Sequence, residues 1–303
     1  MIARFVVAFA LVLVMASDAR AAGRKVTFPF RDADYLWAGE SHGGSAFVPE
    51  SIVAGDRVPL VVFFHGVNVE RVLHSWTGGR GEPDLTELVD RSVTSGASIP
   101  FVFAAPSQTR GAMSGLHMWQ DFDLDEFVRA VDAAIGPQAE IDRDRVYLVG
   151  HSGGGCNLDG GLLRAAGSSR IVARAVLAID TCMDEEDGTA YGNVPESMQV
   201  IVWWQPDIWP RPVEKFRAAF RGAAALSGHG DLVMQVMPGL GPQAHEAILL
   251  DAFTSLLPRV LAGSQLENAG SAAPDALPRA APAPGHGNDP GADRPAGPAS
   301  PAK

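Results

Sequence analysis

A serine stands between glycines at residues 150–154, which read Gly-His-Ser-Gly-Gly in the spacing G-x-S-x-G. An apolar run over 145–150 leads into these residues, and a helical pattern over 157–167 follows them. A serine on a sharp turn between a strand and a helix is strained and exposed, and the glycines beside it leave room for that turn. The pattern therefore predicts that Ser152 is a nucleophile.

Two phosphate-binding motifs of similar glycine content do not fit the same residues. A phosphate loop of the form G-x-x-x-x-G-K-[ST] requires a lysine after its last glycine, and no lysine follows here. A dinucleotide-binding G-x-G-x-x-G beginning at Gly153 and Gly155 would need a third glycine where the chain has Leu158. The glycines therefore indicate a reactive serine, and no cofactor is expected.

A serine hydroxyl attacks only when a base removes its proton, and a third group must orient that base. His245 follows the apolar run 231–239 by a short loop, opens the helical pattern 245–261 and comes after Ser152 in the chain, so we interpret it as the base. A zinc-binding His-Glu-x-x-His motif would need histidine where the chain has Leu249, so no metal site is expected. The other seven histidines are interpreted as elbow, strand-end, loop or tail residues: His42, His65, His74, His117, His151, His229 and His286.

Two aspartates compete for the role of the acid that orients His245. Asp207 follows the apolar run 199–204, two predicted strands after the nucleophile, and is the first choice. Asp180 ends the run 173–180, one strand earlier, and remains the alternative because an acid there can also orient a base.

Acyl transfer also requires backbone donors for the oxyanion that forms on the substrate. The amide of Gly153 comes directly after the nucleophile and is one candidate. The amide of Val67 follows His65 and Gly66 at the end of the apolar run 59–66 and is the other.

Apolar runs and helical patterns alternate along the chain. Strands that are apolar throughout need both of their faces covered, and strand–helix alternation favours a mostly parallel central sheet with helices on both faces. The sequence therefore predicts an α/β fold. The predicted strands are 59–66, 99–106, 145–150, 173–180, 199–204 and 231–239, and the predicted helices are 122–135, 157–167, 212–225 and 245–261.

Several blocks of the sequence resemble the α/β-hydrolase superfamily: VPLVVFFHGVN, IDRDRVYLVGHSGGG, VWWQPDIWP and PGLGPQAHEA. The first two, with the residues that precede them, are most similar to the secreted esterase and polyester-depolymerase branch. The resemblance covers about residues 45–260. It implies an α/β-hydrolase fold, with Ser152, Asp207 and His245 as nucleophile, acid and base, and with Val67 and Gly153 as the oxyanion donors.

The two ends of the chain differ from its centre. Residues 1–21 combine a positive charge, an apolar block shorter than the ~20 residues of a membrane span, and small residues near Ala21, as in a secretory signal peptide. Residues 264–303 hold eight of the 22 prolines and almost no large apolar side chains, which predicts a disordered tail. Residues 22–263 are thus the predicted catalytic domain.

The two cysteines of the chain, Cys156 and Cys182, lie beyond the ends of neighbouring predicted strands. Both are expected at the carboxyl edge of the sheet, where a disulfide would form in an exported protein. The alternative is a pair of small buried thiols.

The charge of the chain restricts the classes of partner. The formal net charge is −11 and the pI is about 5.1, which argues against a nucleic-acid-binding protein because such proteins carry a basic face. Together these features predict a secreted or periplasmic serine hydrolase that acts on small-molecule or polymeric carboxylic esters, without stable membrane insertion. A peptidase or amidase with the same residues, and a catalytically silent binding protein on this scaffold, are the alternatives.

Overall fold

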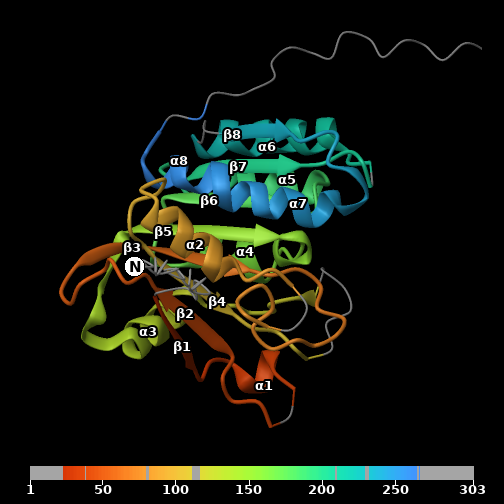
Figure 1. Cartoon of the computed structure of the whole chain (residues 1–303). Coiled ribbons are helices and arrows are strands. Elements are labelled where there is room, and N and C mark those ends of the chain that lie inside the picture. Colours follow the sequence, from red (N-terminus) through yellow and green to blue (C-terminus); the bar gives the residue numbers. More distant parts are fainter. Residues whose placement is uncertain are drawn as a thin grey trace, which may run out of the picture. The chain divides into compact units, whose positions relative to one another are not determined.

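The computed structural model describes residues 23–264 and 266, except positions 38, 80, 81, 111–116, 209 and 229–231. These residues form an eight-stranded sheet in which the strands lie side by side in the order β1-β2-β4-β3-β5-β6-β7-β8 (Figure 1). β2 pairs antiparallel with both β1 and β4, and every other neighbouring pair is parallel. The strands are β1 (Arg24–Phe28), β2 (Gly44–Val48), β3 (Arg57–Phe64), β4 (Val102–Pro106), β5 (Glu140–His151), β6 (Ala175–Ile179), β7 (Gln199–Trp204) and β8 (Leu232–Val236).

Helices cover both faces of the sheet, as the apolar strands predict. Successive side chains of a strand point to opposite faces, so Leu60, Val62 and Phe64 of β3 join the core beneath α3, α4, α5 and α6. Val61 and Phe63 join the core beneath α2, α7 and α8. The helices are α1 (Asp32–Tyr35), α2 (Leu85–Thr94), α3 (Leu124–Ile135), α4 (Gly161–Ser168), α5 (Glu185–Gly192), α6 (Val213–Ser227), α7 (Ala244–Asp251) and α8 (Leu257–Leu261), with a π-helical turn (Ala252–Leu256) between the last two.

The segment after Ser152 differs from the prediction of a helix over 157–167. Residues Ser152–Gly155 form a single 3₁₀ turn, and α4 begins only at Gly161. Three consecutive glycines are poor helix formers, and Gly161 has a φ of 50° that breaks the helical path. A five-residue loop therefore separates the turn that carries Ser152 from α4.

Both predicted terminal segments fall almost wholly outside the described residues. The predicted signal peptide, residues 1–21, is not among them, and of the predicted tail only residues 264 and 266 are described. The described residues all belong to one compact unit that ends at Ala269. None of the helices described is long and apolar enough to span a membrane.

Candidate active site

Three polar side chains lie at the carboxyl edge of the parallel strands. Ser152 directly follows β5, Asp180 directly follows β6, and His245 lies on the first turn of α7, after the loop that leaves β8. Loops at the carboxyl ends of parallel strands meet at one edge of a sheet, where α/β proteins bind their ligands. The topology thus brings together residues that are far apart in the sequence.

The turn that carries Ser152 is strained and tightly packed. Ser152 has a φ of 53°, in the left-handed region that non-glycine residues rarely adopt. A Cβ on Gly66 would lie 2.6 Å from the Ser152 Cβ, and one on Gly154 would collide with the Phe64 carbonyl oxygen. Both positions therefore require glycine, and the loop after β3 is held directly against the serine.

His245 is hydrogen-bonded to Asp180. The distance from His245 Nδ1 to Asp180 Oδ2 is 2.6 Å, and the aspartate is fully buried. An ionised carboxylate only accepts hydrogen bonds, so Nδ1 carries a proton, and in the neutral ring Nε2 is the nitrogen that carries the lone pair. This is the tautomer that a general base requires.

Two further side chains hold Asp180 in its ionised form. Gln205 Nε2 donates to Oδ2 at 2.9 Å, and Arg211 donates to the Asp180 carbonyl oxygen at 3.0 Å and to Oδ1 at 3.3 Å. Burial alone would raise the pKa of the Asp180 carboxyl. The hydrogen bonds from His245 and Gln205 and the charge of Arg211 outweigh burial and hold that pKa below its usual value.

The structure therefore pairs His245 with Asp180, the alternative acid, and not with Asp207. Asp207 Oδ2 instead accepts hydrogen bonds from the backbone amides of Leu240 at 2.8 Å and Gly241 at 3.3 Å. The residue that directly follows β7 is Gln205, which is fully buried and reaches Asp180. Asp207 lies two residues further along the chain, and its hydrogen bonds connect the loop after β7 to the loop before α7.

His65 orients the loop expected to supply an oxyanion donor. The backbone N–H of Gln108 donates to His65 Nε2 at 3.1 Å. The ring proton of His65 is therefore on Nδ1, which donates to the Gly66 carbonyl oxygen at 2.8 Å. Burial lowers the pKa of His65 to about 4, so its ring is neutral. The carbonyl and N–H of one trans peptide unit point in opposite directions, so the Val67 N–H faces away from His65. The donor roles of Val67 and Gly153 remain predictions.

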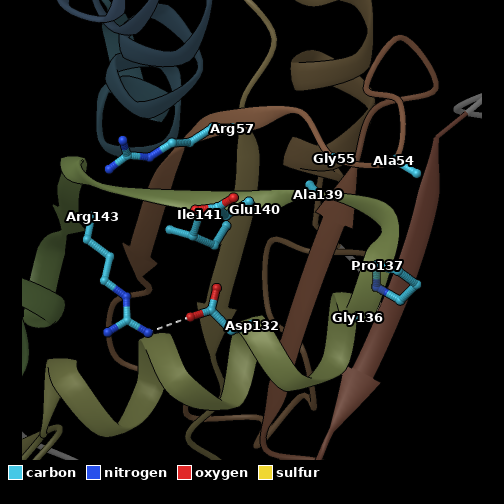
Figure 2. Close-up of a pocket in the computed structure, with 10 residues that line it drawn as sticks. All are labelled: Ala54, Gly55, Arg57, Asp132, Gly136, Pro137, Ala139, Glu140, Ile141 and Arg143. Carbon is cyan, nitrogen blue, oxygen red and sulfur yellow. Dashed lines mark hydrogen bonds and ion pairs between the residues drawn. The ribbon is translucent and has the colours of Figure 1, made fainter.

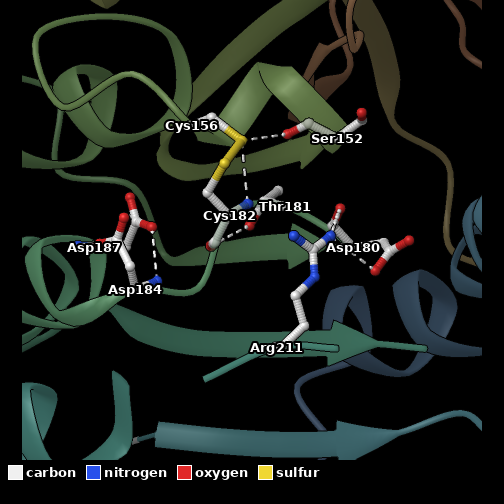
Figure 3. The surroundings of a disulfide bond; sticks show 8 residues. All are labelled: Ser152, Cys156, Asp180, Thr181, Cys182, Asp184, Asp187 and Arg211. Atoms are coloured by element: carbon white, nitrogen blue, oxygen red, sulfur yellow. Dashed lines mark hydrogen bonds and ion pairs between the residues drawn. A yellow bond between two sulfur atoms is a disulfide. The ribbon is translucent and has the colours of Figure 1, made fainter. Parts of the chain in front are cut away.

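A disulfide joins Cys156 to Cys182, with 5.0 Å between their Cα atoms, which confirms the predicted bridge (Figure 3). Cys156 lies four residues after Ser152, and Cys182 lies two residues after Asp180. The Cys182 amide also donates to Cys156 Sγ at 3.1 Å. The bond therefore links the turn that carries Ser152 to the loop that carries the buried carboxylate of Asp180.

Removal of the disulfide is expected to lower both thermal stability and turnover. The two cysteines are 26 residues apart. In the chain-entropy model a bridge over a loop of that length contributes about 3 kcal/mol, which corresponds to a fall in Tm of about 6–12 °C. The comparison is between the oxidised protein and the double variant Cys156→Ala/Cys182→Ala, by calorimetry and thiol titration. Two titratable thiols in the denatured, unreduced wild-type protein would contradict the bridge.

A cavity of about 860 Å³ opens at the opposite end of β5. Arg57 and Glu140 line it at the amino ends of β3 and β5, and an Arg143–Asp132 ion pair of 2.8 Å crosses one side (Figure 2). Ser152 follows the carboxyl end of β5, so this cavity is separate from the candidate site.

Comparison with known proteins identifies the fold. No protein-family model matches the sequence, and no curated protein matches it. Among solved structures, a ferulic acid esterase aligns with a TM-score of 0.52 and 17% identity, over 79% of this chain and 98% of that one. A serine-to-alanine mutant of the feruloyl esterase module from Clostridium thermocellum, complexed with sinapinate, aligns with a TM-score of 0.53 and 12% identity, over 78% of this chain and 88% of that one. The chain has the α/β-hydrolase fold.

Proposed function

We propose that the protein is a serine hydrolase that cleaves carboxylic esters through an acyl-enzyme intermediate. Ser152 is the nucleophile, His245 the general base and Asp180, in place of Asp207, the acid that orients it. The observation that carries this proposal is the 2.6 Å hydrogen bond from His245 Nδ1 to Asp180, at the sheet edge where the strained Ser152 lies.

The proposed reaction follows from the tautomer of His245. Nε2 removes the proton of Ser152 Oγ as that oxygen bonds to the ester carbonyl carbon, and the amides of Val67 and Gly153 stabilise the resulting oxyanion. The tetrahedral intermediate collapses, and the alcohol leaves with the proton from Nε2. Water then attacks the acyl-enzyme in the same way, releases the carboxylic acid and restores Ser152.

Asp180 stabilises the imidazolium that forms in each half of this cycle. It remains a carboxylate throughout, because His245, Gln205 and Arg211 all favour its charged form. Arg211 also donates to the Asp180 backbone carbonyl, which helps to hold this residue at its φ of 48°.

The bond that the protein cleaves is proposed to be a carboxylic ester. Both structural neighbours above are named feruloyl or ferulic acid esterases, and the blocks quoted from the sequence resemble esterases and polyester depolymerases. A peptidase or amidase would use the same three residues with an amine as leaving group. Export is part of the proposal, because a disulfide is typical of proteins that fold outside the cytosol.

The test combines an activity-based probe with a panel of substrates. A fluorophosphonate is expected to label the purified protein on the peptide that contains Ser152. Aryl acetates and butyrates, a feruloyl ester, a soluble polyester and matched anilides then rank the leaving groups and acyl chains. Absence of labelling, or labelling of a different residue, would overturn the serine mechanism and leave a silent binding protein. Faster cleavage of the anilides would assign a peptidase or amidase.

A further inference from the structure

His151, the residue directly before Ser152, contacts His245 in two ways. The two imidazole rings face each other, with 4.3 Å between their centroids and 32° between their planes. His151 Nε2 also lies 2.8 Å from the backbone carbonyl oxygen of His245. Only 3% of the His151 surface is exposed. The last residue of β5 thus touches both the ring and the backbone of the proposed base.

The hydrogen bond settles where the proton of His151 lies. A carbonyl oxygen only accepts, so Nε2 carries the proton and Nδ1 presents a lone pair. Nδ1 is buried without a hydrogen-bond partner among the described residues. Burial first, and the neighbouring His245 second, lower the pKa of His151 to about 3, so the ring is neutral at neutral pH.

This arrangement is costly for a residue that serves only to fill space. An unpaired ring nitrogen in the interior loses its hydrogen bonds to water, and an aromatic hydrocarbon of similar size would avoid that loss. Trp76 packs against His151 in a T-shaped arrangement with 5.8 Å between the ring centroids, so a second aromatic ring helps to hold the His151 imidazole. What His151 offers beyond phenylalanine is the N–H that binds the His245 carbonyl.

We propose that His151 is a positioning residue for His245, an inference that rests on the proposed function. Its N–H fixes the backbone at the first turn of α7, and its ring fixes the plane of the His245 imidazole, so that Nε2 is aimed at Ser152. Because His151 stays neutral, the proton taken from Ser152 meets no second positive charge in the facing ring.

The charged and titratable groups around His245 come from several elements. Asp180 binds it from the end of β6, and Arg211, which precedes α6, binds Asp180 in turn. His65, from the end of β3, is close enough to His151 to act on its charge but is itself neutral. Glu246 is the acidic neighbour on α7 itself. None of these groups replaces the contact that His151 makes with the His245 backbone.

The experiment compares His151→Phe, which keeps a ring and removes the N–H, with His151→Gln, which keeps an N–H donor and removes the ring. His151→Phe is expected to lower kcat by about 10- to 100-fold, because small misplacements of a catalytic group have effects of that size. KM is expected to stay within about twofold, since His151 is only 3% exposed and has little surface to offer a substrate. His151→Gln is expected to recover part of the loss. His117→Phe, at an exposed histidine, is the matched control and is expected to keep the wild-type kcat.

Proton NMR distinguishes a positioning role of His151 from a purely structural one, because loss of packing alone would not change the resonance of the His245 Nδ1 proton. The His245 Nδ1 proton, held between two heavy atoms 2.6 Å apart, is expected to resonate far downfield and to broaden in His151→Phe while Tm stays within a few degrees. Wild-type kcat and an unchanged resonance in His151→Phe would overturn the inference, provided that fluorophosphonate still labels Ser152 in the wild-type protein. A wild-type protein that fails to label overturns the proposed function and this inference with it. If His151→Phe does not fold, kcat and the resonance of His151→Gln decide: values equal to wild type in both would refute a role for the ring.

Discussion

Replacing Ser152 by alanine is expected to lower kcat on an aryl ester by about 10⁶-fold, the size of loss that follows removal of a triad nucleophile. The hydroxyl is the only group removed, and the alanine Cβ occupies the same place against Gly66. The turn therefore keeps its shape, and Tm is expected to change by no more than a few degrees. Any residual turnover is expected to come from the proposed oxyanion donors and from substrate binding.

The measurement pairs turnover with fluorophosphonate labelling. Ser255→Ala, at an exposed serine whose hydroxyl donates to the Asp251 carbonyl, is the matched control and is expected to keep both signals. Labelling of Ser152→Ala at the wild-type rate would show that another residue is the nucleophile.

Replacing Asp180 by asparagine is expected to lower kcat by about 10⁴-fold. An asparagine can present its amide N–H to His245 Nδ1, which favours the tautomer with the proton on Nε2. That tautomer cannot accept the proton of Ser152. The carboxamide also lacks the negative charge that stabilises the imidazolium and pairs with Arg211.

Asp207→Asn is the matched comparison, and its expected cost is less than about tenfold, because its amide oxygen still accepts from Leu240 and Gly241. The kcat values of both variants, measured with Tm as a check on folding, rank the two acids. A larger loss in Asp207→Asn than in Asp180→Asn would show that the acid follows β7.

The strand and turn that carry Ser152 could be predicted from sequence because their signal is local. Gly150, Ser152 and Gly154 lie within five consecutive residues, and the apolar run before them marks the strand. Which aspartate reaches His245 depends instead on the paths that the loops after β6 and β7 take in space. Asp180 and Asp207 both follow apolar runs, so the sequence offers no measure of which carboxylate reaches His245. That information lies in the three-dimensional path of the chain, with Gln205 directly after β7 and Asp207 further out.

Elements whose residues have a low intrinsic propensity for helix or strand could not be predicted from sequence patterns either. α5 reads EEDGTAYG, and its two glycines disfavour a helix. In the structure a Cβ at Gly188 would collide with the Phe216 carbonyl, and one at Gly192 would lie 2.6 Å from that of Phe220. The glycines therefore allow α5 to pack closely against α6, and tertiary contact decides the conformation. The short strand β1 reads RKVTF and shows too little apolar periodicity to be recognised alone.

Ser152 and Asp180 share one property that bears on how this chain responds to selection. Both are non-glycine residues in the left-handed region, with φ of 53° and 48°, and strain of this kind costs about 1–3 kcal/mol per residue. Glycine relieves that strain at either position. At Asp180 this gain is outweighed, because glycine would remove the buried carboxylate that Gln205, Arg211 and His245 bind. A library of variants ranked by heat resistance alone is therefore expected to enrich glycine at position 152, where only a hydroxymethyl group is lost, and to discard the proposed nucleophile. Thermostable descendants that keep the proposed esterase activity must be sought with an activity screen in every round.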